Sequence, residues 1–247
     1  MTVKAKTKNI SIVLYKPKYA GNVGSVARAA KNMGVKKILV VGTADLDREA
    51  MEQRSTHLAA DVLDQIEYCD SIEAALSGFN YIVGTTARLG KARGPFVSPR
   101  KAAQNIADLS QKNKIALLFG PEDTGLANDQ LRLCHCVVTI PTSREFTSLN
   151  LSQAVMILCY EIFIASPAAA NAAETPPKLA LSSETEGMYR QIKDLLGKIG
   201  FLNPENPEYW MMDLRRFFSR AGLLSREVKI VRGICRQLEW YANHKNT

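Results

Sequence analysis

The segment AGNVGSVARAAKNMG, residues 20–34, places three polar side chains where a predicted strand passes into a predicted helix. They are Asn22, Ser25 and Arg28. A guanidinium is essentially always protonated, so Arg28 can hold a phosphate or stabilise a developing alkoxide, but it is a poor free base. A purely structural interpretation is a helix with Ser25 as its N-cap. The segment is therefore either an ordinary helix start or a helix start that positions Arg28 to contact a ligand.

A basic segment, GTTARLGKARGPFVSPRK at residues 84–101, contains no acidic residue. Its glycines and prolines favour an irregular loop. Such a loop can contact phosphates, or it can be a solvated surface, and both interpretations stay open. Its basic residues are Arg88, Lys91, Arg93, Arg100 and Lys101.

Two further segments combine glycine or hydroxyl residues with predicted strand ends: FGPEDTGL at 119–126 and IPTSREFTSLNLSQAV at 140–155. Gly120 allows the backbone to approach a ligand closely. Thr147, Ser148 and Asn150 offer polar groups ahead of a helix that we expect to begin near Leu151. Taken alone, each segment is equally consistent with a turn followed by a helix cap.

These segments follow short apolar runs that are typical of buried parallel strands. The runs cover 10–15, 37–42, 81–87, 115–120 and 136–141. Helix-like segments at 25–33, 48–55, 71–77, 99–109 and 127–133 alternate with them. This alternation predicts an α/β fold with an open, mostly parallel sheet flanked by helices. Ligands of such sheets bind beyond the carboxyl ends of the strands, where the unusual segments lie.

The composition changes after residue 165. We predict a core domain over 1–165, a linker rich in Ala, Pro, Ser and Thr over 166–184, and a small all-helical extension over 185–247. Helical periodicity covers 185–199 and 207–242. We expect four aromatic residues there to form the core of this extension, in preference to stacking on RNA bases. They are Tyr209, Trp210, Phe217 and Phe218.

The 247-residue chain is 46% hydrophobic and carries a formal charge of +8, so it is globular and a polyanion is a plausible partner. Ordinary solubility explains the charge equally well. An odd set of five cysteines and a polar N-terminus favour the cytoplasm. The most apolar stretch, AVMILCYEIFIA, is interrupted by Glu161 and is too short for a membrane span.

Other candidate sites carry less support. CHC at 134–136 lacks a second ligand pair, so we expect a strand entrance and no metal site. YKPKYAGNVG lacks the dinucleotide fingerprint, although Asp45 after the second predicted strand could imitate a ribose ligand. A Rossmann-type nucleotide-cofactor enzyme is therefore a minor alternative.

Taken together, three segments resemble the motifs of the TrmH-type SPOUT RNA 2′-O-methyltransferases. These are NVGSVARAAKNMG, LLFGPEDTGL and IPTSREFTSLNLSQAV, in the family's order and each after a predicted strand. The resemblance covers about residues 8–165. The segment LRRFFSRAGLLSREVKIVRGICRQLE is further similar to the bacterial TrmJ subgroup.

This resemblance implies a trefoil-knotted sheet, a homodimer and S-adenosyl-L-methionine as cofactor. The cofactor-binding residues that it implies are Thr85, Thr86, Ala87, Gly120, Ile140, Thr147, Ser148 and Leu149. The catalytic set that it implies is Asn22, Arg28, Glu122, Ser148 and Asn150.

The activity implied is 2′-O-methylation of tRNA at the first residue of the anticodon loop, position 32, where a cytidine or uridine is modified. The basic residues of 88–101 would then contact RNA. The competing class is a non-catalytic, dimeric RNA-binding protein of the same fold, which would have lost the cofactor and catalytic residues that are intact here.

Overall fold

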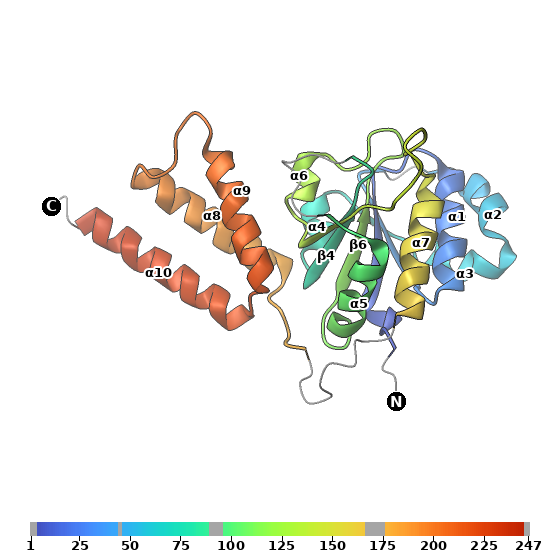
Figure 1. The fold of residues 1–247 in the computed structure, drawn as a ribbon, viewed down its shortest axis with the longest axis horizontal. Helices are drawn as coiled ribbons and strands as arrows, with labels where there is room; N and C mark the ends of the chain where they lie inside the picture. The colour runs from blue at the N-terminus through green and yellow to red at the C-terminus, as the bar shows by residue number, and fades with distance from the viewer. Residues whose placement is uncertain (1–3, 44–45, 89–95, 166–175, 245–247) are drawn as a thin grey trace. The chain divides into compact units, whose positions relative to one another are not determined.

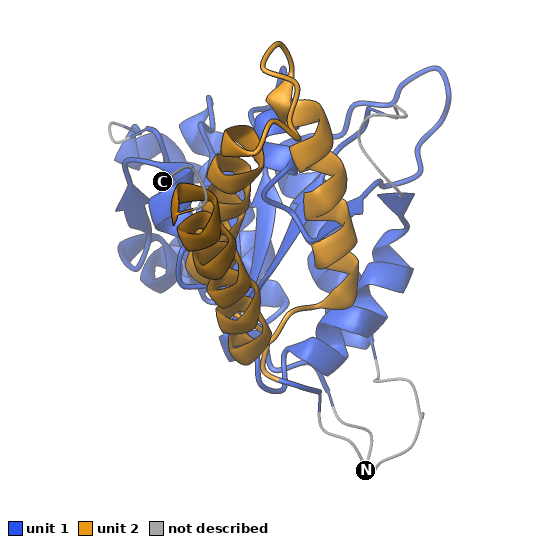
Figure 2. Cartoon of the chain, turned by 90° about the vertical axis from the view of Figure 1, so that its left-hand side faces the viewer, with its two compact units in different colours: residues 1–177 blue, residues 178–247 orange. Residues whose placement is uncertain are grey.

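The computed structural model describes residues 4–43, 46–88, 96–165 and 176–244. It divides into two compact units, residues 1–177 and residues 178–247 (Figure 2). Among the described residues, no helix combines the length and the apolar character needed to cross a membrane.

The first unit is built on a parallel sheet, as the sequence predicts. Its described part holds seven strands in the order β3-β2-β1-β6-β4-β7-β5, and every neighbouring pair is parallel. The strands are β1 (Ile10–Tyr15), β2 (Lys37–Val41), β3 (Glu67–Cys69), β4 (Tyr81–Thr85), β5 (Phe96–Val97), β6 (Ile115–Phe119) and β7 (Cys136–Val138). Strands β3 and β5 were not predicted, because edge strands of two or three partly exposed residues leave no apolar run in the sequence.

Helices cover both faces of this sheet (Figure 1). One apolar core joins the sheet to α1 (Ala20–Asn32), α5 (Pro99–Leu109) and α7 (Leu151–Ile164), with α2 (Arg48–Ser55) and α3 (Ala60–Asp64) packed against α1. A second core on the opposite face joins it to α4 (Ile72–Leu76) and α6 (Asn128–Leu131). Because both faces are covered, all five residues of β6 are buried, which explains their continuous apolar character.

Helix α1 begins at Ala20, five residues before the predicted start at 25. Ser25 is therefore not its N-cap, and that prediction is wrong. The Ser25 hydroxyl instead donates a hydrogen bond to the Gly21 carbonyl oxygen at 3.0 Å, one turn back inside the helix. The first turn of α1 has no capping side chain of its own, since Tyr19 occupies the N-cap position.

The second unit consists of α8 (Ser182–Lys198), α9 (Pro207–Ala221) and α10 (Ser225–His244) around a small apolar core. Helix α8 begins inside the segment predicted as a linker, where the Glu184 carboxylate accepts a 2.8 Å hydrogen bond from the Leu181 N–H. The helical region predicted over 207–242 is two helices, separated at Gly222, whose φ of 62° ends α9.

The prediction that the aromatic residues form the core of this unit is wrong for three of the four. Tyr209, Trp210 and Phe217 are 55%, 47% and 59% exposed. Only Phe218 packs inward, with its ring centroid 6.2 Å from that of Tyr189. The inward stripe of α9 runs through Met211, Leu214 and Phe218, so the other three side chains fall beside it.

Candidate active site and cofactor pocket

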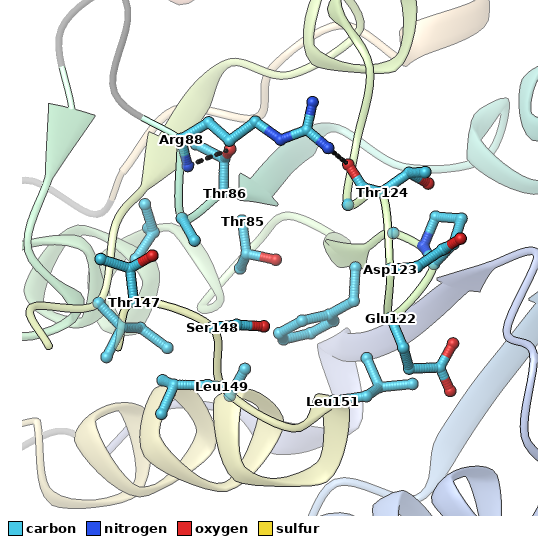
Figure 3. A pocket seen from close by; sticks show the side chains of 18 residues that line it. Thr85, Thr86, Arg88, Glu122, Asp123, Thr124, Thr147, Ser148, Leu149 and Leu151 are labelled. Carbon is cyan, nitrogen blue, oxygen red and sulfur yellow. Dashed lines mark hydrogen bonds between the residues drawn. The ribbon is translucent and has the colours of Figure 1, made fainter. Parts of the chain in front are cut away.

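Strands β6, β4 and β7 are neighbours in the sheet, and the loops that follow their carboxyl ends line one pocket (Figure 3). The structure brings all eight predicted cofactor residues into this pocket. They are Thr85 at the end of β4, Thr86 and Ala87 after it, Gly120 after β6, and Ile140, Thr147, Ser148 and Leu149 after β7.

The pocket combines an apolar interior with a polar margin. Phe119, Val138 and Ile140 contribute apolar surface. Thr147 and Ser148 lie on one side in Figure 3, whereas Glu122 lies on the other. Such a mixture suits a ligand that has a flat apolar part and polar or charged substituents.

Gly120 is required by the packing of its own loop. A Cβ atom at Gly120 would lie 2.4 Å from the Gly125 carbonyl carbon and from the Leu126 nitrogen. Both contacts are with backbone, which cannot move aside as a flexible side chain would. The glycine therefore sets the shape of one wall of the pocket.

Arg88 lies at the rim of this pocket rather than out in a solvated loop. Its guanidinium donates a hydrogen bond to the Thr124 carbonyl oxygen, and its backbone N–H donates to the Thr86 hydroxyl at 3.1 Å (Figure 3). Arg88 thereby connects the loops that follow β4 and β6.

Glu122, which also lines the pocket, holds the first turn of α1. Its carboxylate accepts hydrogen bonds from the Lys18 N–H at 2.9 Å, the Tyr19 N–H at 3.4 Å and the Asn22 side-chain amide at 2.9 Å. The Tyr19 N–H belongs to the N-cap residue and the Lys18 N–H to the residue before it, and a carboxylate at this position interacts favourably with the helix dipole. Glu122 therefore supplies the cap that the local sequence of α1 lacks.

Asn150 extends this network to α7. Its side-chain amide donates to the Asn22 side-chain oxygen at 2.9 Å, while its own side-chain oxygen accepts the Ser152 N–H at 2.9 Å as the N-cap of α7. The starts of α1 and α7 are thus joined by the hydrogen bond between Asn22 and Asn150, and Asn22 is in turn bound to Glu122. Three of the five predicted catalytic residues form one hydrogen-bonded chain.

The other two predicted catalytic residues lie on either side of this chain. Ser148 is in the cofactor pocket. Arg28 is exposed and lines a separate hollow between α1 and α7, which includes Leu149, a residue shared with the pocket. Within the described part of the chain, the Arg28 guanidinium makes no ion pair or hydrogen bond.

Two of the remaining predicted RNA-contacting residues lie side by side on α5. Arg100 lies in the first turn of α5, 3.4 Å from the Glu161 carboxylate. Lys101 follows it and is exposed. Lys91 and Arg93, like Asp45, lie outside the described residues.

No role was predicted for Lys18, which lies just before α1. Lys18 forms an ion pair with Asp123, and this hydrogen bond lowers the pKa of the Asp123 carboxyl. Because 105 residues separate the two side chains, no local pattern could have shown the contact.

The CHC segment lies at the entrance of β7, as predicted. The His135 Nδ1 accepts a hydrogen bond from the Ile82 N–H at 3.1 Å, and its ring stacks on Tyr81 with 5.2 Å between centroids. Burial lowers the pKa of His135 to about 4 and raises that of the Cys136 thiol to about 11. No group of three or more potential metal ligands occurs among the residues described.

Comparisons with known proteins agree with this architecture. Residues 9–160 match the SpoU rRNA Methylase family, and residues 183–247 match the C-terminal domain of the tRNA methyltransferase TrmJ. The tRNA (cytidine/uridine-2′-O-)-methyltransferase TrmJ of Pectobacterium atrosepticum is 37% identical over 92% of this chain and 95% of its own length.

Solved structures give the same result. TrmJ from Z. mobilis ZM4 superposes with a TM-score of 0.80 at 28% identity, over 93% of this chain and 98% of that one. An AdoMet-bound rRNA methyltransferase from Sinorhizobium meliloti shares the fold, with a TM-score of 0.51 and 21% identity over 66% of this chain and 57% of that one. With its core domain, its three pocket loops and its C-terminal helices all matched, the chain belongs to the SpoU methylase family and carries a C-terminal domain of the TrmJ type.

Proposed function

We propose that this chain transfers a methyl group from S-adenosyl-L-methionine to a ribose 2′-hydroxyl of tRNA, at the cytidine or uridine in position 32 of the anticodon loop. The observation that carries the proposal is the continuous path from the pocket through Glu122 and Asn22 to Asn150. A pocket for the methyl donor and polar groups for the acceptor are thereby built on the same strand ends. The substrate of the Pectobacterium relative supports tRNA as the acceptor.

The pocket residues fit this cofactor. Its apolar interior suits an adenine ring, and the Thr147 and Ser148 hydroxyls suit ribose or aminocarboxylate oxygens. Glu122 adds negative charge that favours a sulfonium cation, whereas Asp123 is already paired with Lys18. When bound, S-adenosylmethionine supplies an electrophilic methyl group. The AdoMet-bound structure of the same fold supports the assignment.

The chain's own residues orient the acceptor and stabilise charge. Asn22 and Asn150 are fixed by the hydrogen bond between them and by their bonds to Glu122 and Ser152, so the second N–H of each side-chain amide is preorganised to donate to a ribose oxygen. The Arg28 guanidinium is positively charged and uncompensated, so it stabilises the alkoxide that develops as the 2′-hydroxyl loses its proton. It also holds a neighbouring phosphate, and the proton leaves through that phosphate or through water.

The position of Arg28 supports a homodimer. In one chain it faces a hollow beside the cofactor pocket rather than the pocket itself. Further along α7, Tyr160, Phe163 and Ile164 are between 47% and 50% exposed, an apolar surface that suits a second copy. The site is completed in such a pair when Arg28 of one copy approaches the pocket of the other. The trefoil knot stays a prediction, and we place the enzyme in the cytoplasm with its tRNA substrate.

Incubation with labelled S-adenosylmethionine and total tRNA, followed by nucleoside analysis, tests the function. The expected product is 2′-O-methylcytidine or 2′-O-methyluridine from the anticodon loop. Binding of tRNA without transfer would favour the non-catalytic alternative. Binding of NAD in place of S-adenosylmethionine would favour the Rossmann alternative.

A further inference from the structure

A second arginine, Arg54 in the last turn of α2, lines a hollow next to the one that contains Arg28. Asn22 and Asn150, the hydrogen-bonded pair at the candidate site, line the same hollow. The two hollows are adjacent, because Ser25 and Gln153 line both. No sequence motif predicted a role for Arg54.

Two glycines of α1 determine where Arg54 lies. A Cβ atom at Gly24 would lie 2.0 Å from the Met51 carbonyl oxygen, so α2 crosses α1 at a distance that only glycine allows. One turn earlier, a Cβ atom at Gly21 would lie 3.3 Å from the Arg54 Cγ. The aliphatic part of Arg54 therefore passes over Gly21, at the start of α1.

The charged side chains that line the two hollows are both positive. Arg54 is the single charged side chain among the residues that line it, and Arg28 is the single one in the adjoining hollow. Neither arginine makes an ion pair with any described residue. By contrast Arg48, on the same helix as Arg54, is paired with Glu52 at 2.6 Å and with Asp64.

We propose that Arg54 binds a backbone phosphate of the RNA substrate, a different phosphate from the one held by Arg28. This inference rests on the proposed function. Seven residues of helix separate Gly21, beneath Arg54, from Arg28, which corresponds to about 10 Å along α1. Within one copy, the two arginines are therefore spaced to contact separate phosphates of the RNA. A guanidinium can hold a phosphate through two parallel hydrogen bonds, which adds direction to the charge.

The variant Arg54→Gln tests the proposal in the full-length protein, with tRNA binding measured over a series of salt concentrations. We expect roughly a tenfold loss of tRNA affinity at low salt, as for the loss of one hydrogen-bonded charge. The slope of the logarithm of affinity against the logarithm of salt concentration should fall in magnitude by about one, as for the loss of one phosphate contact. The KM for tRNA should rise, while the KM for S-adenosylmethionine and kcat stay close to wild type. Arg54→Lys should recover part of the affinity, since it keeps the charge but not the paired hydrogen bonds.

Arg48→Gln is the matched control, because it removes one positive charge from the same helix at a residue that is already neutralised. Equal tRNA affinity and equal salt dependence for Arg54→Gln and Arg48→Gln would overturn the inference. So would a loss of affinity in Arg54→Gln accompanied by a lower unfolding temperature, because Arg54 would then act by stabilising the last turn of α2. A wild-type protein that neither binds nor methylates tRNA would instead refute the proposed function, together with this inference.

Discussion

A substitution at Glu122 can distinguish its role as the cap of α1 from a role as a proton acceptor in methyl transfer. The variant Glu122→Gln keeps the size of the side chain but replaces one acceptor oxygen with an NH₂ donor. Whichever way the amide turns, that donor faces either the Lys18 N–H or the N–H groups of Tyr19 and Asn22. Loss of a helix cap and of hydrogen bonds to a charged acceptor costs about 1–2 kcal/mol.

For a unit of 177 residues this destabilisation corresponds to a fall of roughly 2–8 °C in Tm, at about 2–4 °C per kcal/mol. Methyl transfer should fall by much less than a hundredfold, because Asn22 keeps its bond to Asn150. Thermal unfolding followed by circular dichroism and steady-state kinetics with tRNA measure the two effects. Asp123→Asn is the control, since this neighbouring carboxylate makes an exposed ion pair of little energetic value.

A proton acceptor would behave in the opposite way. Loss of a general base typically lowers the rate by about 10²–10⁴. An unchanged Tm in Glu122→Gln, together with such a loss of kcat, would refute the interpretation of Glu122 as a cap.

Four further outcomes follow from the structure. Arg28→Ala should lower kcat by about 10²–10³, because an electrostatic contact in the transition state is lost. Its Tm should change little, because Arg28 is exposed. Near-normal turnover by both Arg28→Ala and Arg28→Lys would contradict this. Gly120→Ala should abolish S-adenosylmethionine binding in calorimetry, because its Cβ meets backbone at 2.4 Å. A chain that ends at residue 177 should still bind S-adenosylmethionine but bind tRNA more weakly, and equal methylation by the truncated and full chains would show that the helical unit has another role. The pKa of His135 is lowered to about 4 in the folded protein, so on acidification the unfolded protein protonates this imidazole before the folded protein does. The resulting contribution to stability is complete above about pH 6.5 and is lost as the pH falls towards 4. His135→Asn should therefore flatten this part of a plot of Tm against pH.

The sequence by itself determined the sheet and the position of the pocket. Parallel strands covered on both faces must be apolar throughout, so β1, β2, β4, β6 and β7 were visible as apolar runs. Since ligands bind beyond the carboxyl ends of such strands, the three loops could be selected before any contact was known. The edge strands β3 and β5 were not visible, because their short, partly exposed segments carry no such constraint.

Only the tertiary structure decided how the polar residues act. Glu122 caps a helix that begins 102 positions earlier in the chain, and Lys18 meets Asp123, so neither contact leaves a periodic or local signal. The same holds for Arg54, whose place depends on the close crossing of α1 and α2 at Gly24. On α9, the face that packs inward runs through Met211, Leu214 and Phe218, and this leaves Trp210 and Phe217 outside the core. Local propensity and hydrophobic period fix which elements form, whereas contacts between residues distant in sequence depend on how those elements pack.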